Sequence, residues 1–370
     1  MRIAFSFLLV IHGLIHLMGF VKGFQLAEMA QLRQPVSALA GVFWLLTCLL
    51  FLASGGLFFA GKHFGWMLLL PAILLSQTLI IQQWQDAKFG TIANIVALIG
   101  LVLAFGAWRF DKMVSSEKQA FLAVPTEDKR LKEEELAPLP PVVQRWVRQS
   151  GAVGQPRVYT VHLKQSGRLR TQKEGDWLPF QAEQYFTVDH PGFIWIASIQ
   201  AMPMVEIVGR DKYENGRGNM RIELMSLFQM VNATGPEIDQ GSLLRYLAET
   251  CWFPDAALQP YIQWDSVGLH AAQATMTYGD IRASGVFYFN ESDDLLRFEA
   301  KRYYSRKEGA TLEDWQIVNH EWKTLNGLRI PVRSEVIWKL KDGDYSWLTL
   351  EITDIHYNEH LSGNESLRPD

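Results

Sequence analysis

The stretch VSALAGVFWLLTCLLFLASGGLFFA (residues 36–60) contains no charged side chain and is long enough to cross a bilayer core of about 30 Å as one helix. Similar apolar stretches lie at residues 3–21, 64–83 and 89–108. The first of them resembles a signal peptide in position, but its apolar run is long and no small-residue cleavage site follows it. Residues 1–110 are therefore predicted to form an uncleaved domain of four transmembrane helices.

An even number of spans places the start of the chain and its C-terminal part on the same side of the membrane. The positive-inside rule compares the basic residues that flank the spans on the two sides, and here it favours a cytoplasmic C-terminal part. The basic residues on the shared side are Arg2, Lys62, Arg109, Lys112 and Lys118, and those on the other side are Lys22, Arg33 and Lys88.

Four polar side chains inside the predicted helices form a candidate intramembrane layer: His12, His16, Gln77 and Asn94. The two histidines are four residues apart and share a helix face, and helix geometry places His16, Gln77 and Asn94 at similar depth. Hydrogen bonding between helices, worth about 1 kcal/mol for each bond, explains such a layer. The alternative is a metal, quinone, haem or proton site. Because no carboxylate or third histidine lies at that depth, we favour the structural interpretation and predict no metal and no cofactor.

The charge of the chain is unevenly distributed. Of 35 Lys and Arg and 39 Asp and Glu, six and two respectively lie in the first 110 residues, which leaves 29 against 37 for the rest. An acidic second part argues against nucleic acid as a partner. The only cysteines, Cys48 and Cys251, exclude a disulfide-rich scaffold.

Residues 111–141 are charged and then proline-rich, and we predict a linker without an apolar face that could add to a core. A short amphipathic helix is expected at 141–150. The region 142–358 is predicted to be a second, β-rich domain, and residues 359–370 a polar tail.

Beyond residue 156 the apolar residues recur with period two, which is typical of strands. Short turns such as Asn326-Gly327 separate many of the strands and imply an antiparallel meander. A helix with an apolar face interrupts it at 239–251. The predicted fold class is a four-helix membrane domain followed by an antiparallel α+β domain with a curved sheet. The predicted strands lie near 157–171, 177–188, 193–201, 204–214, 219–232, 261–267, 270–278, 281–289, 295–304, 315–324, 328–338 and 345–357.

The strand at 193–201 is apolar on both faces, so each face must be covered. The helix at 239–251 can cover one face, and the other needs a second layer, a partner or an apolar ligand. Ordinary core packing remains the simpler explanation for most of the aromatic rings. The candidate ligand-binding residues are Trp177, Phe180, Phe193, Trp195, Glu249 and Trp252.

Glu249 has two interpretations. It lies four residues after Arg245 on the predicted helix, a spacing that is typical of a stabilising ion pair. It also lies close to Trp252, so it could instead be a desolvated acid with a raised pKa.

Several motifs in the second domain resemble an uncharacterised bacterial family over about residues 138–358. The motifs are WLPFQAEQYF (177–186), PGFIW (191–195), GRGNM (216–220), LLRYLAETCWFP (243–254) and GLRIPVRSEV (327–336). The β domain in turn resembles the lipoprotein-carrier half-barrel, which implies a concave sheet that shelters acyl chains. Members of the uncharacterised family with a single N-terminal anchor would display the domain outside the cytoplasm, so the family resemblance implies an extracytoplasmic β domain at the bacterial inner membrane, against the charge count above.

Sequence motifs typical of nucleophilic catalysis, phosphate binding or zinc-dependent catalysis are absent from the sequence, and we do not predict an enzyme. Three classes of function remain open. The first is a membrane-tethered domain that binds or transfers a lipid, an acyl chain or another hydrophobic small molecule. The second is an assembly protein whose β domain docks a protein partner, and the third is a membrane enzyme or redox protein with a site near His12 and His16.

Overall fold

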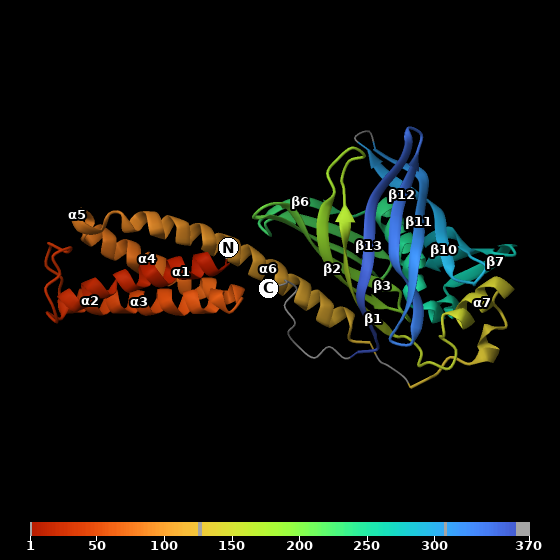
Figure 1. The fold of residues 1–370 in the computed structure, drawn as a ribbon, viewed down its shortest axis with the longest axis horizontal. Coiled ribbons are helices and arrows are strands. Elements are labelled where there is room, and N and C mark those ends of the chain that lie inside the picture. The colour runs from red at the N-terminus through yellow and green to blue at the C-terminus, as the bar shows by residue number, and fades with distance from the viewer. Residues whose placement is uncertain (1, 125–127, 307–308, 360–370) are drawn as a thin grey trace. The chain divides into compact units, whose positions relative to one another are not determined.

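The computed structural model describes residues 2–124, 128–306 and 309–359, and the chain divides into two compact units. Residues up to Met113 make up the helical unit, and most residues from Val114 onward make up the β domain. Figure 1 traces both parts of the chain.

The helical unit contains the four predicted spans. Helices long and apolar enough to cross a membrane cover Arg2–Gly23, Ala38–Phe59, His63–Gln82 and Gly90–Phe121. The last one runs past the predicted end at residue 108. The helices are α1 (Arg2–Ile15), α2 (Leu17–Gly23), α3 (Ala38–Phe59), η1 (His63–Gly65), α4 (Trp66–Gln82), α5 (Trp84–Ala87) and α6 (Gly90–Phe121).

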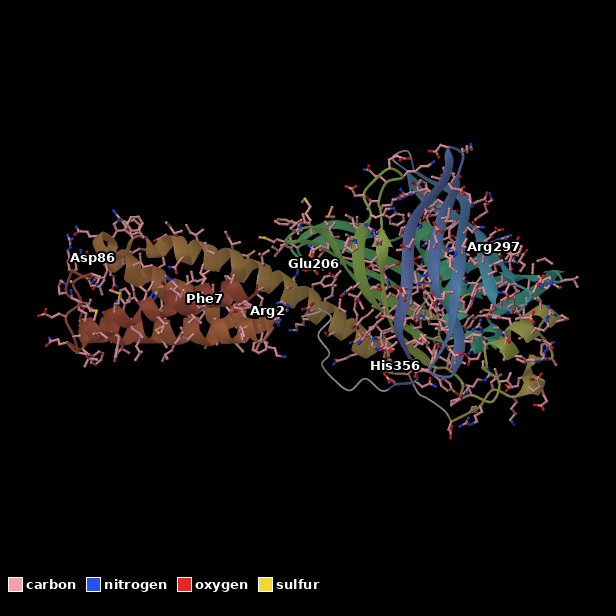
Figure 2. All side chains as sticks on the ribbon, viewed as in Figure 1. Arg2, Phe7, Asp86, Glu206, Arg297 and His356 are labelled. Atoms are coloured by element: carbon pink, nitrogen blue, oxygen red, sulfur yellow. The ribbon has the colours of Figure 1, made fainter. Side chains whose placement is uncertain are left out.

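The helical unit has an apolar exterior and a partly polar interior. Phe7, labelled in Figure 2, is 65% exposed, and Leu39 and Ile92 are exposed to a similar degree. Ser54 and Thr47 are buried instead. Soluble proteins rarely expose so much contiguous apolar surface, whereas a lipid environment favours it.

The β domain is built on one antiparallel sheet of thirteen strands within the described residues, which confirms the predicted fold class. Its strand order is β6-β5-β4-β3-β2-β1-β13-β12-β11-β10-β9-β8-β7, so β1 and β13 join two meanders. The sheet curls into a half-barrel (Figure 1). The strands are β1 (Thr160–Leu169), β2 (Leu178–Thr187), β3 (Gly192–Met202), β4 (Val205–Glu214), β5 (Arg217–Leu224), β6 (Phe228–Ala233), β7 (Ile262–Gly268), β8 (Ala271–Tyr278), β9 (Ile281–Phe289), β10 (Leu295–Arg306), β11 (Gly309–Leu325), β12 (Leu328–Leu340) and β13 (Gly343–Tyr357).

Turn residues with positive φ set the register of the hairpins. Asn326 and Gly327 have φ of 46° and 87°, as a tight two-residue hairpin turn requires. The prediction of a single strand over 219–232 was wrong. Met225 and Ser226, both with φ of 55°, turn the chain between β5 and β6, and no Gly, Asn or Pro marks this turn in the sequence.

The interpretation of residues 111–141 as a linker without a core-forming face needs correction. Leu131, Leu136 and Leu139 are buried in the main core cluster of the β domain. They belong to a segment that includes η2 (Glu133–Leu136) and leads into α7 (Pro141–Gln149). Because these leucines are spaced irregularly between charged residues, no periodic pattern revealed them.

Both faces of β3 are covered, as its composition requires. On the concave face, Phe193 is buried beside Tyr213. On the convex face, Ile194 and Ile196 are buried, and the ring of Phe121 lies close to Gly192. The last turns of α6 therefore provide part of the cover that the sequence left open.

Candidate functional site

Helix α8 (Pro236–Glu249) lies against the concave face and contacts β5, β9 and β10. Gly235 precedes it with φ of 122°, a conformation that favours glycine, and Pro236 starts the helix. Gly241, Arg245 and Glu249 are spaced four residues apart and so share one face of α8. This face meets the inward-facing side chains of the strands.

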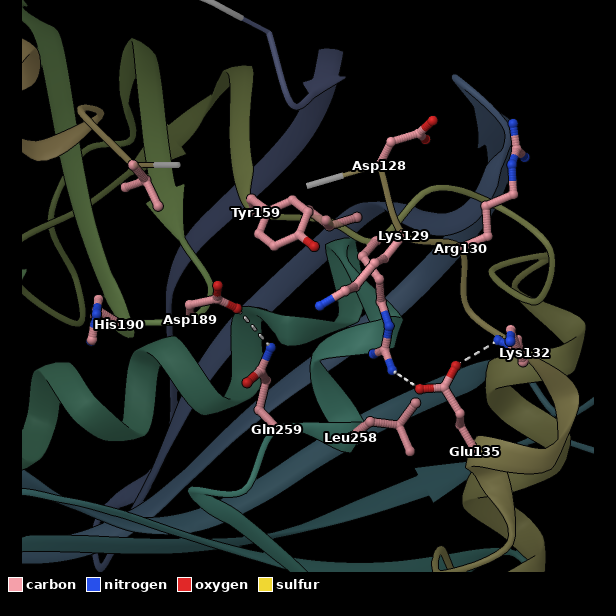
Figure 3. Close-up of a pocket in the computed structure, with 13 residues that line it drawn as sticks. Asp128, Lys129, Arg130, Lys132, Glu135, Tyr159, Asp189, His190, Leu258 and Gln259 are labelled. Atoms are coloured by element: carbon pink, nitrogen blue, oxygen red, sulfur yellow. Dashed lines mark hydrogen bonds and ion pairs between the residues drawn. The ribbon is translucent and has the colours of Figure 1, made fainter. Parts of the chain in front are cut away.

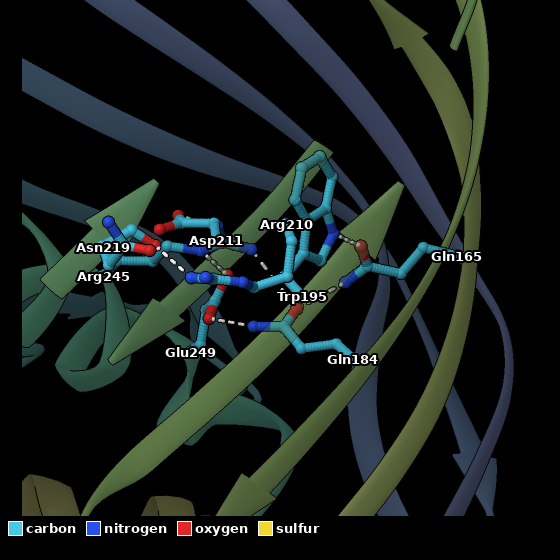
Figure 4. Close-up of polar contacts among 8 residues, drawn as sticks. All are labelled: Gln165, Gln184, Trp195, Arg210, Asp211, Asn219, Arg245 and Glu249. Carbon is cyan, nitrogen blue, oxygen red and sulfur yellow. Dashed lines mark hydrogen bonds and ion pairs between the residues drawn. The ribbon is translucent and has the colours of Figure 1, made fainter. Parts of the chain in front are cut away.

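Arg245 is the centre of a polar network on this face (Figure 4). Its Nε donates to Glu249 Oε1 at 2.8 Å, and its Nη1 donates to Asp211 Oδ2 at 2.7 Å. The guanidinium carbon also lies 4.8 Å from the ring centroid of Phe193 and 5.1 Å from that of Trp195. The network fixes α8 to β3 and β4 by charge and by ring contacts.

Two glutamines extend the network across the sheet. Trp195 Nε1 donates to Gln165 Oε1 at 2.9 Å, and Gln165 Nε2 donates to Gln184 Oε1 at 3.2 Å. Gln184 Nε2 then donates to Glu249 Oε2 at 2.7 Å. The chain of donors thus ends on a buried carboxylate, which satisfies the polar groups that burial would otherwise penalise.

Both interpretations of Glu249 describe part of what the structure shows. The predicted ion pair with Arg245 is present. Burial also raises the pKa of Glu249, an effect that Arg245 and Gln184 only partly offset. For Arg245, burial disfavours the cation, but Glu249 and Asp211 outweigh burial and raise its pKa.

Beyond α8, the concave face carries apolar side chains that are only partly buried. Trp195 lies on β3 and Ile207 on the adjacent strand β4. Ile317 and Leu348 lie on β11 and β13. All four pack against the core cluster without being enclosed by it. The face therefore combines one satisfied polar network with an apolar surface that is left partly open.

A second cation lies on the same face. Arg302 comes from β10, and its guanidinium carbon lies 4.6 Å from the ring centroid of Trp315. Trp315 is buried, and its indole Nε1 has no hydrogen-bond partner within the described parts of the chain. Among the described residues, no acceptor takes a hydrogen bond from Arg302, in contrast to the paired Arg245.

The structure brings four of the six candidate ligand residues together. Phe180 contacts Trp195 with ring centroids 6.1 Å apart, and Phe193 and Glu249 meet at Arg245. The other two lie apart from this group. Trp252 is buried in the core and donates to the Pro331 carbonyl, and Trp177 precedes β2 and stacks with Arg170.

The candidate residues in the helical unit also meet. His12 Nε2 lies 2.9 Å from Asn94 Oδ1, and Asn94 Nδ2 donates to Gln77 Oε1 at 3.0 Å. Ser76, which the sequence reasoning missed, lies 3.0 Å from both His16 Nε2 and Asn94 Oδ1. These groups bond to one another across α1, α4 and α6. No group of three or more His, Cys, Asp or Glu suited to a metal ion occurs in the described parts of the chain.

A pocket of about 1030 Å³ lies elsewhere in the β domain, and both charged and apolar side chains line it (Figure 3). Arg157 and Glu135 pair across it at 2.5 Å, and Gln259 donates to Asp189 at 3.4 Å. None of the predicted site residues lines this pocket. Two of its polar pairs bond to each other, and charged side chains make up much of its rim.

Fold and site together define the class of protein: a set of four apolar helices followed by a curled half-barrel whose concave face holds an apolar surface and buried charges. The chain belongs to a family of unknown function (DUF6544), which matches residues 129–350. The match begins within the segment that was predicted to be a linker. A comparison with curated proteins gives no match.

Proposed function

We propose that this protein binds an apolar ligand, a membrane lipid or its acyl chain, on the concave face of the β domain. The observation that carries the proposal is the partly open apolar surface formed by Trp195, Ile207, Ile317 and Leu348. Covering such a surface is favourable by roughly 25 cal/mol for each Å² removed from water. An acyl chain supplies matching area without polar groups that need partners.

The resemblance to lipoprotein-carrier half-barrels supports the same proposal by analogy of shape, since a curved antiparallel sheet can shelter an acyl chain. The four apolar helices would keep the domain next to a bilayer, which is a source of such ligands. In this proposal the protein resides in the bacterial inner membrane with its β domain outside the cytoplasm, and it either stores the ligand or passes it on.

A protein partner is the second candidate, because β6 is an edge strand with exposed apolar side chains. Phe228 and Met230 on β6 are 66% and 59% exposed, and β5 is the one neighbour of β6 among the described strands. An exposed apolar edge is suited to strand addition by another chain. The groups of the intramembrane layer bond to one another, so we do not propose a redox site there.

Native mass spectrometry of the purified full-length protein, combined with lipid extraction of the same sample, tests the first candidate. We expect a stoichiometric adduct that carries an acyl chain. Ile207→Glu places a carboxylate on the concave face and should remove the adduct. Gln181→Glu adds the same charge at an exposed position of β2 and should retain it.

A folded Ile207→Glu protein that keeps its adduct would move the site away from the concave face. A protein that carries no lipid adduct but is bound to another protein chain would favour the second candidate instead.

A further inference from the structure

Arg302 stands out among the inward-facing residues of β10. The residues on the concave face of this strand alternate as Phe298, Ala300, Arg302 and Tyr304, so a charged side chain follows two apolar ones. On its α8 side, the guanidinium lies close to Gly241, where a Cβ would sit 3.6 Å from Arg302 Nε. The cation is thus held between a glycine of the helix and the ring of Trp315.

The environment of Arg302 contains donors without acceptors. Arg245 is paired with Asp211 and Glu249, and neither carboxylate accepts a hydrogen bond from Arg302 in the described structure. The Trp315 indole N–H next to it is buried and has no partner among the described residues, whereas Arg302 itself is half-buried. An unpaired buried donor is costly, and together with a neighbouring cation that has no acceptor it is characteristic of a site that an acceptor completes.

The surroundings of Arg302 disfavour its positive charge on balance. Burial and the nearby Arg245 lower its pKa to about 10, and Asp211 and Glu249 counteract only part of this effect. Arg302 therefore remains a cation at neutral pH while lacking a counter-ion in direct contact. An anion at this point would relieve both the desolvation of the cation and its repulsion by Arg245.

We propose that Arg302 and the Trp315 indole N–H form the anion-binding end of the concave site, so that the ligand is an amphiphile with one anionic oxygen head group, a carboxylate or a phosphate. The inference rests on the proposed function and specifies its ligand class. A guanidinium matches either head group with two parallel donors, and the indole supplies a third. Tyr304 and Trp338, with ring centroids 4.9 Å apart, provide an aromatic wall beside the head group.

The test measures dissociation constants on the full-length protein in amphipol, so that free detergent does not compete. Oleate and oleyl alcohol form one pair of probes, and oleoyl lysophosphatidate and monoolein form the second. Each pair shares an acyl chain and differs in the charge of the head group. We expect the wild-type protein to bind at least one anionic probe about tenfold more tightly than its neutral counterpart. The tighter of the two anionic probes distinguishes a carboxylate from a phosphate ligand.

Two variants assign the effect to the proposed residues. Arg302→Gln should weaken the preferred anionic probe by about tenfold or more and leave the neutral probe unchanged. Trp315→Phe keeps an aromatic ring but removes the N–H and part of the indole, so the lost donor should weaken the anionic probe more than its neutral counterpart, to a smaller extent than Arg302→Gln does. Arg297→Gln on the opposite face of β10 is the matched control, because Arg297 pairs with Glu299 there. It should bind all probes as the wild-type protein does.

The outcomes separate the two proposals. If the wild-type protein binds neither member of either pair, both the proposed function and this inference are wrong. If it binds neutral and anionic probes equally, or if Trp315→Phe and a folded Arg302→Gln protein keep the full preference, only the anion site is wrong. Should Arg302→Gln fail to fold, Trp315→Phe decides, since comparing the anionic with the neutral probe separates the lost donor from the lost indole volume.

Discussion

Asp255 should make the β domain less stable as the pH rises from about 4 to about 7. The residue is buried in η4 (Pro254–Leu258). Its Oδ2 accepts a hydrogen bond from the Val158 backbone N–H at 2.9 Å, whereas its Oδ1 is buried without a side-chain or backbone partner among the residues that the structure describes. Burial raises the pKa of Asp255 to about 7, and hydrogen bonds and Arg157 offset part of that effect.

The sign follows from proton binding. Between the unfolded pKa of 3.8 and the folded pKa of about 7, the folded state holds a proton that the unfolded state has lost. The stability that Asp255 contributes is therefore complete below pH 3.8 and is lost as the pH rises to about 7. From pH 5 to pH 8 the loss is up to about 3 kcal/mol, at 1.36 kcal/mol for each pH unit below the folded pKa.

Asp255→Asn removes the titration and keeps the shape. The amide oxygen can accept from Val158, so the variant should gain stability over the wild-type protein between pH 5 and pH 8. For a domain of this size, 3 kcal/mol corresponds to roughly 6–12 °C in Tm. Tryptophan fluorescence during thermal unfolding of the full-length protein measures the difference in Tm between the variant and the wild-type protein at pH 5 and at pH 8. Asp265→Asn, at an exposed position of β7, is the control, and its difference in Tm from the wild-type protein should be the same at both pH values. A gap between Asp255→Asn and wild type that stays constant over this range would refute the reasoning.

Two further predictions concern the helical unit, and both are measured as the Tm of its helical circular dichroism in detergent. Gly13→Ala should destabilise α1 against α3 by about 1–3 kcal/mol, because a Cβ would lie 2.9 Å from the Phe51 Cβ. A Cβ added at Gly56 would meet no atom within 4 Å, so Gly56→Ala should be neutral or stabilising by up to about 1 kcal/mol. Equal changes in Tm for Gly13→Ala and Gly56→Ala would contradict the packing argument. Ser76→Ala should cost about 1 kcal/mol by removing a shared partner of the intramembrane layer. Thr78→Ala, whose hydroxyl bonds only within its own helix in the described structure, should cost less, and the reverse order would count against the layer as a stabilising element.

The fold was largely predictable because its signals are local. The span at 36–60 is uniformly apolar, and the observed α3 covers Ala38–Phe59. Period-two alternation and turns such as Asn326-Gly327 located most strands within a few residues. The break between β5 and β6 was missed because Met225 and Ser226 adopt positive φ without the usual turn residues.

The candidate site was only partly predictable, because its contacts join residues far apart in the sequence. The spacing of Arg245 and Glu249 within one helix indicated their ion pair. Asp211 and Gln184 complete the network from two strands, and only the fold brings them to Arg245. A usable signal did exist for Arg302. A charged residue at an inward position of a period-two strand is unusual enough to mark a site.

The central claim is that an apolar ligand lies on the concave face of the β domain, and crosslinking inside cells tests it most directly. A photoreactive phenylalanine analogue replaces Leu348, which faces the concave side, or Thr349, the next residue, which faces the convex side. Both positions are partly exposed, so they differ mainly in direction. We predict a lipid-sized mass adduct after irradiation at position 348 and none at position 349. Equal adducts at both positions, or none at position 348 in a folded protein, would contradict the account.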